Sequence, residues 1–178
     1  MKWFGSDEQY NYLVVSLLGP SLQDLFDFCR QRFTLKTVLL LADQLIERFE
    51  TLHTHSHTHG SVKPANFAMG DGKNRHIVHM IDFGRSKKFK KSMINGSDHI
   101  DYSEYAASYR GLFFSSNACS GIEYSRRDDM VSLGYMLIYF LRGSLPWKDV
   151  GRSMQGDAES LRLKKATSAE ALCEGYPV

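Results

Sequence analysis

The sequence predicts an α+β fold that is mainly α. Two helical patterns support this class, because apolar residues recur on one face at residues 35–49 and residues 130–141 are apolar almost all round. Strand patterns are shorter and fewer, at residues 10–18 and in a hairpin pattern between residues 67 and 81. A short helix that is apolar all round is typical of the buried centre of a helical domain.

The composition is that of one ordinary globular domain. The 178 residues are 43% hydrophobic and 24% charged, and the net charge of +2 is too small to indicate a nucleic-acid partner. The cysteines Cys29, Cys119 and Cys173 show no metal-ligand spacing, which predicts reduced thiols. No stretch approaches the roughly 18 apolar residues of a membrane span, and the start does not resemble a signal peptide. We therefore expect a cytoplasmic or nuclear protein without a membrane partner.

The first half of the chain predicts one strand and two capped helices. The strand, residues 10–18, ends at Gly19-Pro20. Ser21 is placed to cap a helix whose apolar positions are Leu22, Leu25, Phe26 and Cys29. Thr34 can cap a longer helix with the apolar positions Leu35, Val38, Leu39, Ala42, Leu45, Ile46 and Phe49.

The second half predicts the central apolar helix and two further helices. The apolar helix begins near Asp128-Asp129 and ends at the segment Gly143-Ser144-Leu145-Pro146. The later helices are expected at residues 158–165 and 168–173, in a more polar part of the chain.

Histidine occupies every second position from His53 to His59. In an extended segment, these four imidazoles would share one face and could bind zinc, copper or nickel. The alternative is a polar loop after the helix, with His59 packed beneath a neighbouring site. No nearby carboxylate or cysteine completes a metal-ligand set, which favours the loop.

Two loops that flank the predicted hairpin contain complementary polar residues. Lys63 and Asn66 precede the strand patterns at residues 67–69 and 76–81, and Asp82 follows them. A hairpin between the loops would bring these three residues together. Mg²⁺ prefers hard oxygen ligands such as a carboxylate and an amide oxygen, and a lysine can neutralise a phosphoryl oxygen. The set therefore predicts a site for a metal-bound triphosphate.

A dense basic run follows at residues 85–91, Arg-Ser-Lys-Lys-Phe-Lys-Lys. Such a run could direct nuclear import or bind an acidic partner. The alternative is a solvated, mobile segment without a specific partner.

The order of several motifs resembles the eukaryotic protein kinases. These motifs are Leu17-Leu18-Gly19-Pro20-Ser21-Leu22, the helix segment from Thr37 to Gln44, Val62-Lys63-Pro64 with Asn66, and Ile81-Asp82-Phe83-Gly84. Three later segments narrow the resemblance to the casein kinase I family. They are Gly121-Ile122-Glu123 with Ser125-Arg126-Arg127-Asp128-Asp129, Ser132-Leu133-Gly134-Tyr135, and Gly143-Ser144-Leu145-Pro146-Trp147.

The resemblance implies a serine/threonine kinase fold that uses ATP and Mg²⁺ and takes a protein as substrate or scaffold partner. Residues 1–18 would be a remnant of the small-lobe strands and the hinge, and residues 19–178 a large lobe that is truncated at its carboxyl end. Leu18 would offer its backbone to adenine, and Lys63 would contact the transferred phosphoryl group. Asn66 and Asp82 would ligate the metal ions.

The resemblance also implies a structural role for Asp129. This carboxylate would accept hydrogen bonds from the backbone of the loop at His59. A simpler interpretation is that Asp129 caps the apolar helix, and both roles are compatible.

Departures from the family pattern predict impaired catalysis. The catalytic loop of the family reads His-Arg-Asp, and this chain has His59-Gly60-Ser61. The family's aspartate accepts the proton of the substrate hydroxyl, and losing such a base lowers the rate about 10²–10⁴-fold. The glycine-rich loop and the strand lysine that position the ATP phosphates do not occur. Gly60 and Leu112 stand where the family has arginines, which weakens the expected recognition of a phosphorylated or acidic substrate.

Three interpretations remain. The first, which we favour, is a pseudokinase that binds protein partners. The second is an active kinase whose small lobe belongs to a fuller form of the protein. The third is a decayed copy without function, which predicts a chain that does not fold cooperatively.

Overall fold

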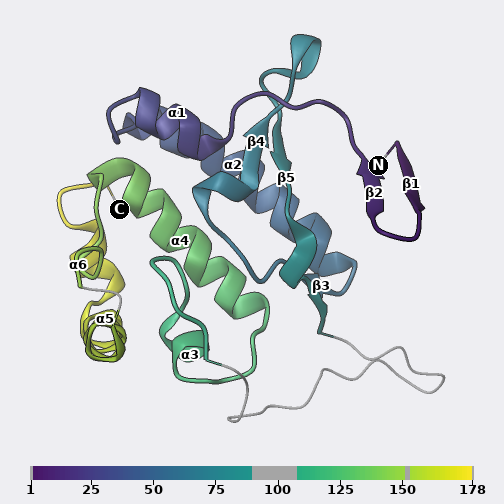
Figure 1. Ribbon diagram of the computed structural model, residues 1–178. Helices are drawn as coiled ribbons and strands as arrows, with labels where there is room; N and C mark the ends of the chain where they lie inside the picture. Colours follow the sequence, from purple (N-terminus) through teal and green to yellow (C-terminus); the bar gives the residue numbers. More distant parts are fainter. Residues whose placement is uncertain (1, 90–107, 151–152, 178) are drawn as a thin grey trace.

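The computed structural model describes residues 2–89, 108–150 and 153–177 (Figure 1). Helices predominate over short strands, so the α+β, mainly α class predicted from the sequence is confirmed. The helices are α1 (Leu22–Phe28), α2 (Leu35–Thr54), α3 (Ser116–Cys119), α4 (Arg126–Arg142), α5 (Met154–Ala166) and α6 (Ala169–Cys173). The strands are β1 (Trp3–Ser6), β2 (Asn11–Val14), β3 (His57–Thr58), β4 (Phe67–Met69), β5 (Val78–Met80) and β6 (Lys87–Lys88). Three 3₁₀ turns complete the described elements, at η1 (Pro64–Asn66), η2 (Gly72–Asn74) and η3 (Phe83–Arg85).

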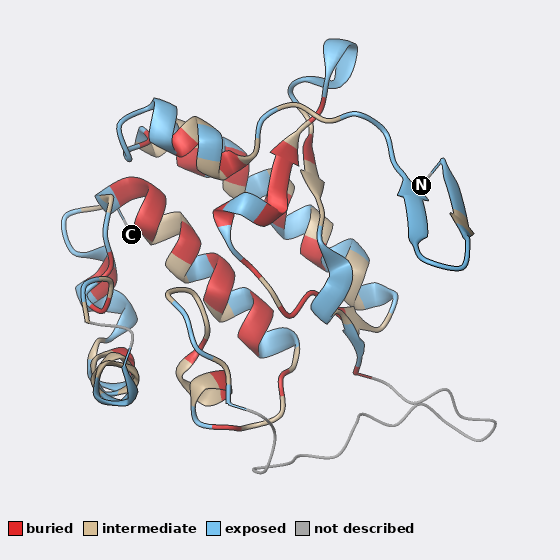
Figure 2. Cartoon of the chain, viewed as in Figure 1, coloured by how far each residue is buried: buried red, intermediate tan, exposed pale blue. Residues whose placement is uncertain are grey.

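The described strands form three separate antiparallel pairs, β1–β2, β3–β6 and β4–β5. The β4–β5 hairpin is present where the sequence predicts one; it aligns Phe67 with Met80 and lies against α2 (Figure 1). The β1–β2 hairpin lies to one side of the helices and is almost entirely exposed (Figure 2). The packed part of the molecule is therefore built around the helices and the β4–β5 hairpin.

The strand predicted at residues 10–18 is correct only over Asn11–Val14. Beyond β2 the backbone bonds to β4 instead of to a neighbouring strand of its own sheet. The Gly19 N–H donates to Met69 O at 2.8 Å, and the Met69 N–H donates to Pro20 O at 3.0 Å. Residues 15–18 therefore belong to no strand, and the chain pairs with β4 only from Gly19 onward.

Capping residues start the first two helices where the sequence predicts. The Ser21 hydroxyl accepts the Asp24 N–H at 3.1 Å, and the Asp24 carboxylate accepts the Ser21 N–H at 2.9 Å. Thr34 Oγ1 accepts the Thr37 N–H at 3.2 Å at the start of α2. These bonds satisfy donors that the first turn of a helix leaves free.

The buried side of α2 differs from the predicted apolar face, because it includes Leu41, which the predicted pattern does not, and leaves out Leu39 and Ile46. Val38, Leu41, Leu45 and Phe49 are buried, whereas the predicted core positions Leu39 and Ile46 are exposed by 60% and 49%. Spacings of three and four residues between the buried positions keep them on one side of the helix. Leu39 and Ile46 lie beyond the edge of that side.

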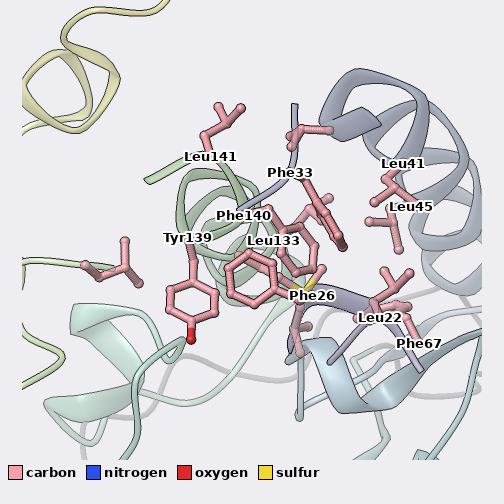
Figure 3. Close-up of a cluster of buried hydrophobic side chains, with 14 of the residues drawn as sticks. Leu22, Phe26, Phe33, Leu41, Leu45, Phe67, Leu133, Tyr139, Phe140 and Leu141 are labelled. Atoms are coloured by element: carbon pink, nitrogen blue, oxygen red, sulfur yellow. The ribbon is translucent and has the colours of Figure 1, made fainter. Parts of the chain in front are cut away.

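The helix α4 is the central element of the core (Figures 1 and 3). It begins at Arg126, two residues before the predicted start, after the N-cap Ser125. The Asp128 carboxylate accepts the Ser125 N–H at 2.8 Å, so the capping interpretation of Asp129 is wrong. The helix ends at Arg142, and the φ of 77° at its C-cap Gly143 lies in the left-handed region that favours glycine.

Aromatic rings join α1 and α4 in the middle of this core. The Phe26 ring lies 4.9 Å from that of Tyr139, 5.2 Å from that of Phe140 and 5.3 Å from that of Phe33, between ring centroids. All four rings are buried in one cluster with leucines of α2 and α4 (Figure 3). Such close, tilted ring contacts favour a single packing of the two helices.

The two carboxyl-terminal helices are confirmed, and α5 is longer than predicted. It spans Met154–Ala166, and Ser168 caps α6 at Ala169–Cys173. No helix in the described part of the chain is both long and apolar enough to cross a bilayer.

Candidate active site

The β4–β5 hairpin brings the two predicted site loops side by side. The Ile81 N–H, just after β5, donates to the carbonyl of Asn66, just before β4, at 3.0 Å. Asp82 is the next residue and opens η3. Asn66 and the residue before Asp82 are thus adjacent across the hairpin, as the sequence predicts.

The polar residues of the two loops differ in burial. Lys63 and Asp82 are exposed, whereas Asn66 is buried. Asp82 has a φ of 62°, a left-handed conformation that is uncommon for a residue with a side chain. Such conformations cost about 1–3 kcal/mol and cluster at functional sites.

The amide of Asn66 faces Ser61. Its Nδ2 donates to Ser61 O at 2.7 Å and to Ser61 Oγ at 3.1 Å. These two bonds fix the orientation of the amide, so that its oxygen, Oδ1, is the atom turned away from Ser61. An amide oxygen is a suitable ligand for a hard cation.

His59 connects the two loops from below. Its Nε2 lies 3.0 Å from Ile81 O, and its Nδ1 accepts the Ser61 N–H at 3.2 Å. Because Nδ1 accepts, the ring carries its proton on Nε2, which donates to the carbonyl. Burial lowers the pKa of His59, against the opposing effect of the Ile81 carbonyl, so the neutral ring is favoured. The prediction that His59 packs beneath the site is confirmed.

Asp129, a residue of α4, forms hydrogen bonds with the backbone of the same loop. The Asp129 carboxylate is fully buried and accepts the backbone N–H groups of His59 at 2.8 Å and Gly60 at 3.1 Å. Tyr124 OH donates to Asp129 at 2.8 Å, and His53 Nε2 lies 2.9 Å from it. The hydrogen bonds expected from the backbone of the His59 loop are therefore present.

The other histidines do not form the predicted one-sided row. The helix α2 continues through Thr54, so His53 is helical, and His55 Nδ1 bonds to Thr51 O at 2.7 Å. Ser56 then adopts a left-handed φ of 64°, which changes the direction of the chain before β3. In the described residues, no group of three His, Cys, Asp or Glu side chains could hold a metal ion.

The segment of Leu18 lies beside the hairpin that carries Asn66. Leu18 is half-buried, and the neighbouring Gly19 N–H donates to Met69 O at 2.8 Å. A Cβ on Gly19 would lie 2.7 Å from Gly70 O, so this close approach of two backbones requires glycine.

Two exposed basic residues in the described part of the basic run contact other elements. The Arg85 guanidinium lies over the rings of Tyr109 and Phe114, at 5.8 and 5.9 Å from their centroids. Lys87 Nζ lies 3.3 Å from Glu123 Oε1. The last two residues of the run, Lys90 and Lys91, lie outside the described residues.

Two features of the site escaped the sequence analysis. Gly60 has a φ of 74°, and a Cβ on it would lie 2.5 Å from Arg85 O, so any side chain would force the two loops apart. The bonds of His53 and Tyr124 to Asp129 also went unpredicted. The left-handed glycine could have been suspected from its place between two polar residues, but the long-range bonds have no local pattern.

Leu112 is held by its backbone. Trp147 Nε1 donates to Leu112 O at 2.7 Å, and the Leu112 side chain is half-buried against the core. Leucine supplies no cation at this position.

Comparison with known protein families agrees with this geometry. The family model described as the protein kinase domain matches residues 1–172. The match covers both site loops, the Asp129 network and the central helix α4. The chain therefore belongs to the protein kinase domain family.

Proposed function

We propose that this chain is a pseudokinase of the casein kinase I type, which transfers phosphate weakly or not at all. Ser61 is the observation on which the proposal rests. It follows His59-Gly60 in the loop held by Asp129, and its hydroxyl accepts the Asn66 Nδ2–H at 3.1 Å. In the protein kinases that this chain resembles, the residue at this position is the catalytic aspartate.

The chemical reason is the basicity of the side chain. An aspartate accepts a substrate proton at neutral pH, whereas a serine hydroxyl is not a base there. Losing general-base catalysis lowers a rate about 10²–10⁴-fold, which corresponds to roughly 3–5 kcal/mol of barrier. Substrate positioning by the other loop residues would leave some activity.

Nucleotide binding is a separate part of the proposal. The exposed Asp82 carboxylate and the Asn66 amide oxygen are hard ligands that suit Mg²⁺, and Lys63 can neutralise a phosphoryl oxygen. The backbone of Leu18 would contact adenine. When bound, Mg²⁺ would neutralise charge on the phosphates, while these residues orient them. With few further contacts to the nucleotide, we expect weak binding.

The exposed apolar surface of the chain is better explained by binding to a protein partner than by catalysis alone. The β1–β2 hairpin is largely exposed (Figure 2), and it and the segment after it expose large apolar side chains, including Trp3, Phe4, Leu13 and Leu17. Several large apolar side chains exposed on one short element can mark an interaction site. This supports a scaffold role in which the hairpin contributes to partner binding.

The casein kinase I assignment within the family rests on three segments. Residues 121–129, 132–135 and 143–147 resemble that family. The first includes the carboxylate of Asp128, which caps α4, and that of Asp129, which binds the His59 loop. The second lies within α4, and the third follows its last residue.

A thermal melt of the chain with ATP and excess Mg²⁺ tests nucleotide binding. A ligand at a hundred times its Kd adds about 2.7 kcal/mol to the folded state, so the melting temperature should rise. EDTA and the variant Asp82→Asn should each remove that rise. A cooperative melt that ignores Mg²⁺-ATP would contradict nucleotide binding, and a non-cooperative melt would favour the decayed copy.

Phosphotransfer is then measured with labelled ATP and a casein substrate. We expect transfer at least about 10²-fold below that of an active kinase assayed in parallel. Transfer at the rate of the active enzyme would contradict the pseudokinase proposal and favour the second interpretation.

A further inference from the structure

A buried lysine and a cysteine meet far from the proposed nucleotide site. Lys164 of α5 is 4% exposed and is the only lysine or arginine classed as buried among the described residues. Its Nζ donates to Gly111 O and Phe114 O, both at 2.8 Å. Its third neighbour is Cys119 Sγ of α3, at 3.7 Å.

These three neighbours suit a neutral amine as well as an ammonium ion. An ammonium ion has three hydrogens to donate, and a neutral amine has two hydrogens and one lone pair. In the ammonium form, Nζ donates to the Cys119 sulfur as well. In the neutral form, with the two hydrogens on the carbonyls of Gly111 and Phe114, the lone pair would face that sulfur. Burial lowers the pKa of Lys164, against the opposing effect of Cys119, which increases the neutral fraction.

A cavity beside Cys119 gives a small oxidant a route toward the sulfur. Cys119 is partly exposed and lines a cavity of about 200 Å³ between the loop at residues 108–111 and α5. Burial raises the pKa of the Cys119 thiol, and Lys164 opposes this effect. The thiol is therefore less ionised than a free one but remains within reach of peroxide.

We propose that Lys164 and Cys119 form a reversible covalent sulfenamide bond when the protein meets hydrogen peroxide. Peroxide first oxidises the thiol to a sulfenic acid: the O–O bond breaks, one oxygen is retained on sulfur, and the other leaves as water. The Lys164 nitrogen then attacks sulfur, forming an S–N bond and releasing the sulfenic oxygen as a second water. In total, one thiol, one amine and one peroxide give one sulfenamide and two waters. Sulfenic acids condense with a backbone nitrogen to a sulfenamide by the same loss of water, and the oxidation is reversible.

The bond would change the loop at residues 110–114. The sulfenamide nitrogen retains one hydrogen, so it can donate to only one of Gly111 O and Phe114 O. The other carbonyl loses its donor, which is unfavourable for a buried polar group. Peroxide would thus loosen this loop, which the unmodified Lys164 stabilises through hydrogen bonds to two carbonyls.

The test treats the folded chain with hydrogen peroxide, blocks the remaining thiols with N-ethylmaleimide and digests the protein without reductant. Mass spectrometry should find the Cys119 and Lys164 peptides joined, at the sum of their masses less two hydrogens. Dithiothreitol should separate them. Cys29 and Cys173 are exposed and serve as internal controls. Their links to any lysine should be about tenfold or more less abundant, because no folded contact raises their effective concentration.

Two variants separate the link from simple oxidation. Cys119→Ser should abolish the joined peptide. Lys164→Arg keeps a cation that can donate to both carbonyls, but a guanidinium stays protonated and cannot attack sulfur. In this variant, peroxide should convert Cys119 into sulfenic acid, detectable with dimedone, and no joined peptide should appear. Melting curves confirm that each variant is folded.

Several results would overturn the proposal. One is oxidation of Cys119 to sulfinic acid in the wild-type chain without any joined peptide. Another is an equal yield of joined peptide after unfolding in urea, because the link would then not depend on the folded geometry. A third is the persistence of the link in a folded Lys164→Arg chain.

Discussion

Asp129 Oδ2 accepts the backbone N–H of His59 at 2.8 Å, across a sequence separation of 70 residues. The same carboxylate bonds the Gly60 N–H through Oδ1 at 3.1 Å. The loop that contains Ser61 is therefore positioned by a carboxylate of α4. Since Asp129 is fully buried, no water replaces these bonds if the carboxylate is lost.

We expect Asp129→Asn to lower the free energy of unfolding by about 3–5 kcal/mol. An amide of the same size turns an NH₂ group toward N–H and O–H donors, so it loses acceptors and adds repulsion. Urea unfolding measures the change. Asp43→Asn is the matched control, because Asp43 is exposed on α2, and it should change stability by less than about 0.5 kcal/mol. Equal effects of the two variants would contradict the role assigned to Asp129.

Gly60→Ala should also destabilise the protein, by about 2 kcal/mol or more. The left-handed φ of 74° disfavours a side chain, and a Cβ would lie 2.5 Å from Arg85 O. Gly134→Ala in α4 is the control, because a Cβ there meets nothing within 4 Å. Alanine in a helix should stabilise by about 0.5–1 kcal/mol relative to glycine. Denaturant unfolding measures both changes. If both variants gain stability, the loops that contain Gly60 and Arg85 are not tightly packed against each other.

The helices were largely predictable because their signals are local. Ser21 and Thr34 are capping residues adjacent to apolar periodicity, and both cap the helices that the sequence assigns to them. The width of the buried face is not a local property. Leu39 and Ile46 fit a helical period, but the elements that pack on α2 do not cover them. Periodicity indicates which side is apolar, and only tertiary packing decides how much of that side is buried.

The contacts of the candidate site divide in the same way, into those set by local sequence and those set by tertiary packing. The proximity of Asn66 to the residue before Asp82 was predictable, because a short hairpin joins them. The bonds of His53 and Tyr124 to Asp129 were not, because they depend on how α2 and α4 pack. His53 also belonged to an alternating pattern that resembled an extended segment. The helix nevertheless continues to Thr54, since no proline or glycine stops it.

The stability contributed by His59 should depend on pH. Burial lowers the pKa of His59 in the folded state, so below the unfolded value of about 6.5 the unfolded chain binds a proton that the native chain resists. This stability is complete above that pH and is lost as the pH falls through the folded pKa, by at most about 1.4 kcal/mol per pH unit. The groups that act on the ring are Asp129, Asp82, Lys63 and the Ile81 carbonyl.

The measurement compares the wild-type chain with His59→Gln by urea unfolding at several pH values. Glutamine does not titrate and can still donate to Ile81 O. We expect the advantage of the wild-type chain to shrink as the pH falls from 7.5 to 5.5. An advantage that grows toward acidic pH would mean that the folded protein stabilises the charged ring, contrary to its buried position.

Ser61→Asp should raise phosphotransfer if the missing base is the main defect. The new carboxylate can accept the Asn66 Nδ2–H that Ser61 Oγ now accepts at 3.1 Å, so the loop need not rearrange. Restoring a general base should increase the rate about 10²-fold or more. Ser61→Ala is the control for loss of the hydroxyl, and Asp82→Asn in the Ser61→Asp background should abolish the gain. If Ser61→Asp leaves the rate unchanged while Mg²⁺-ATP still raises the melting temperature, nucleotide positioning limits the reaction instead of proton transfer.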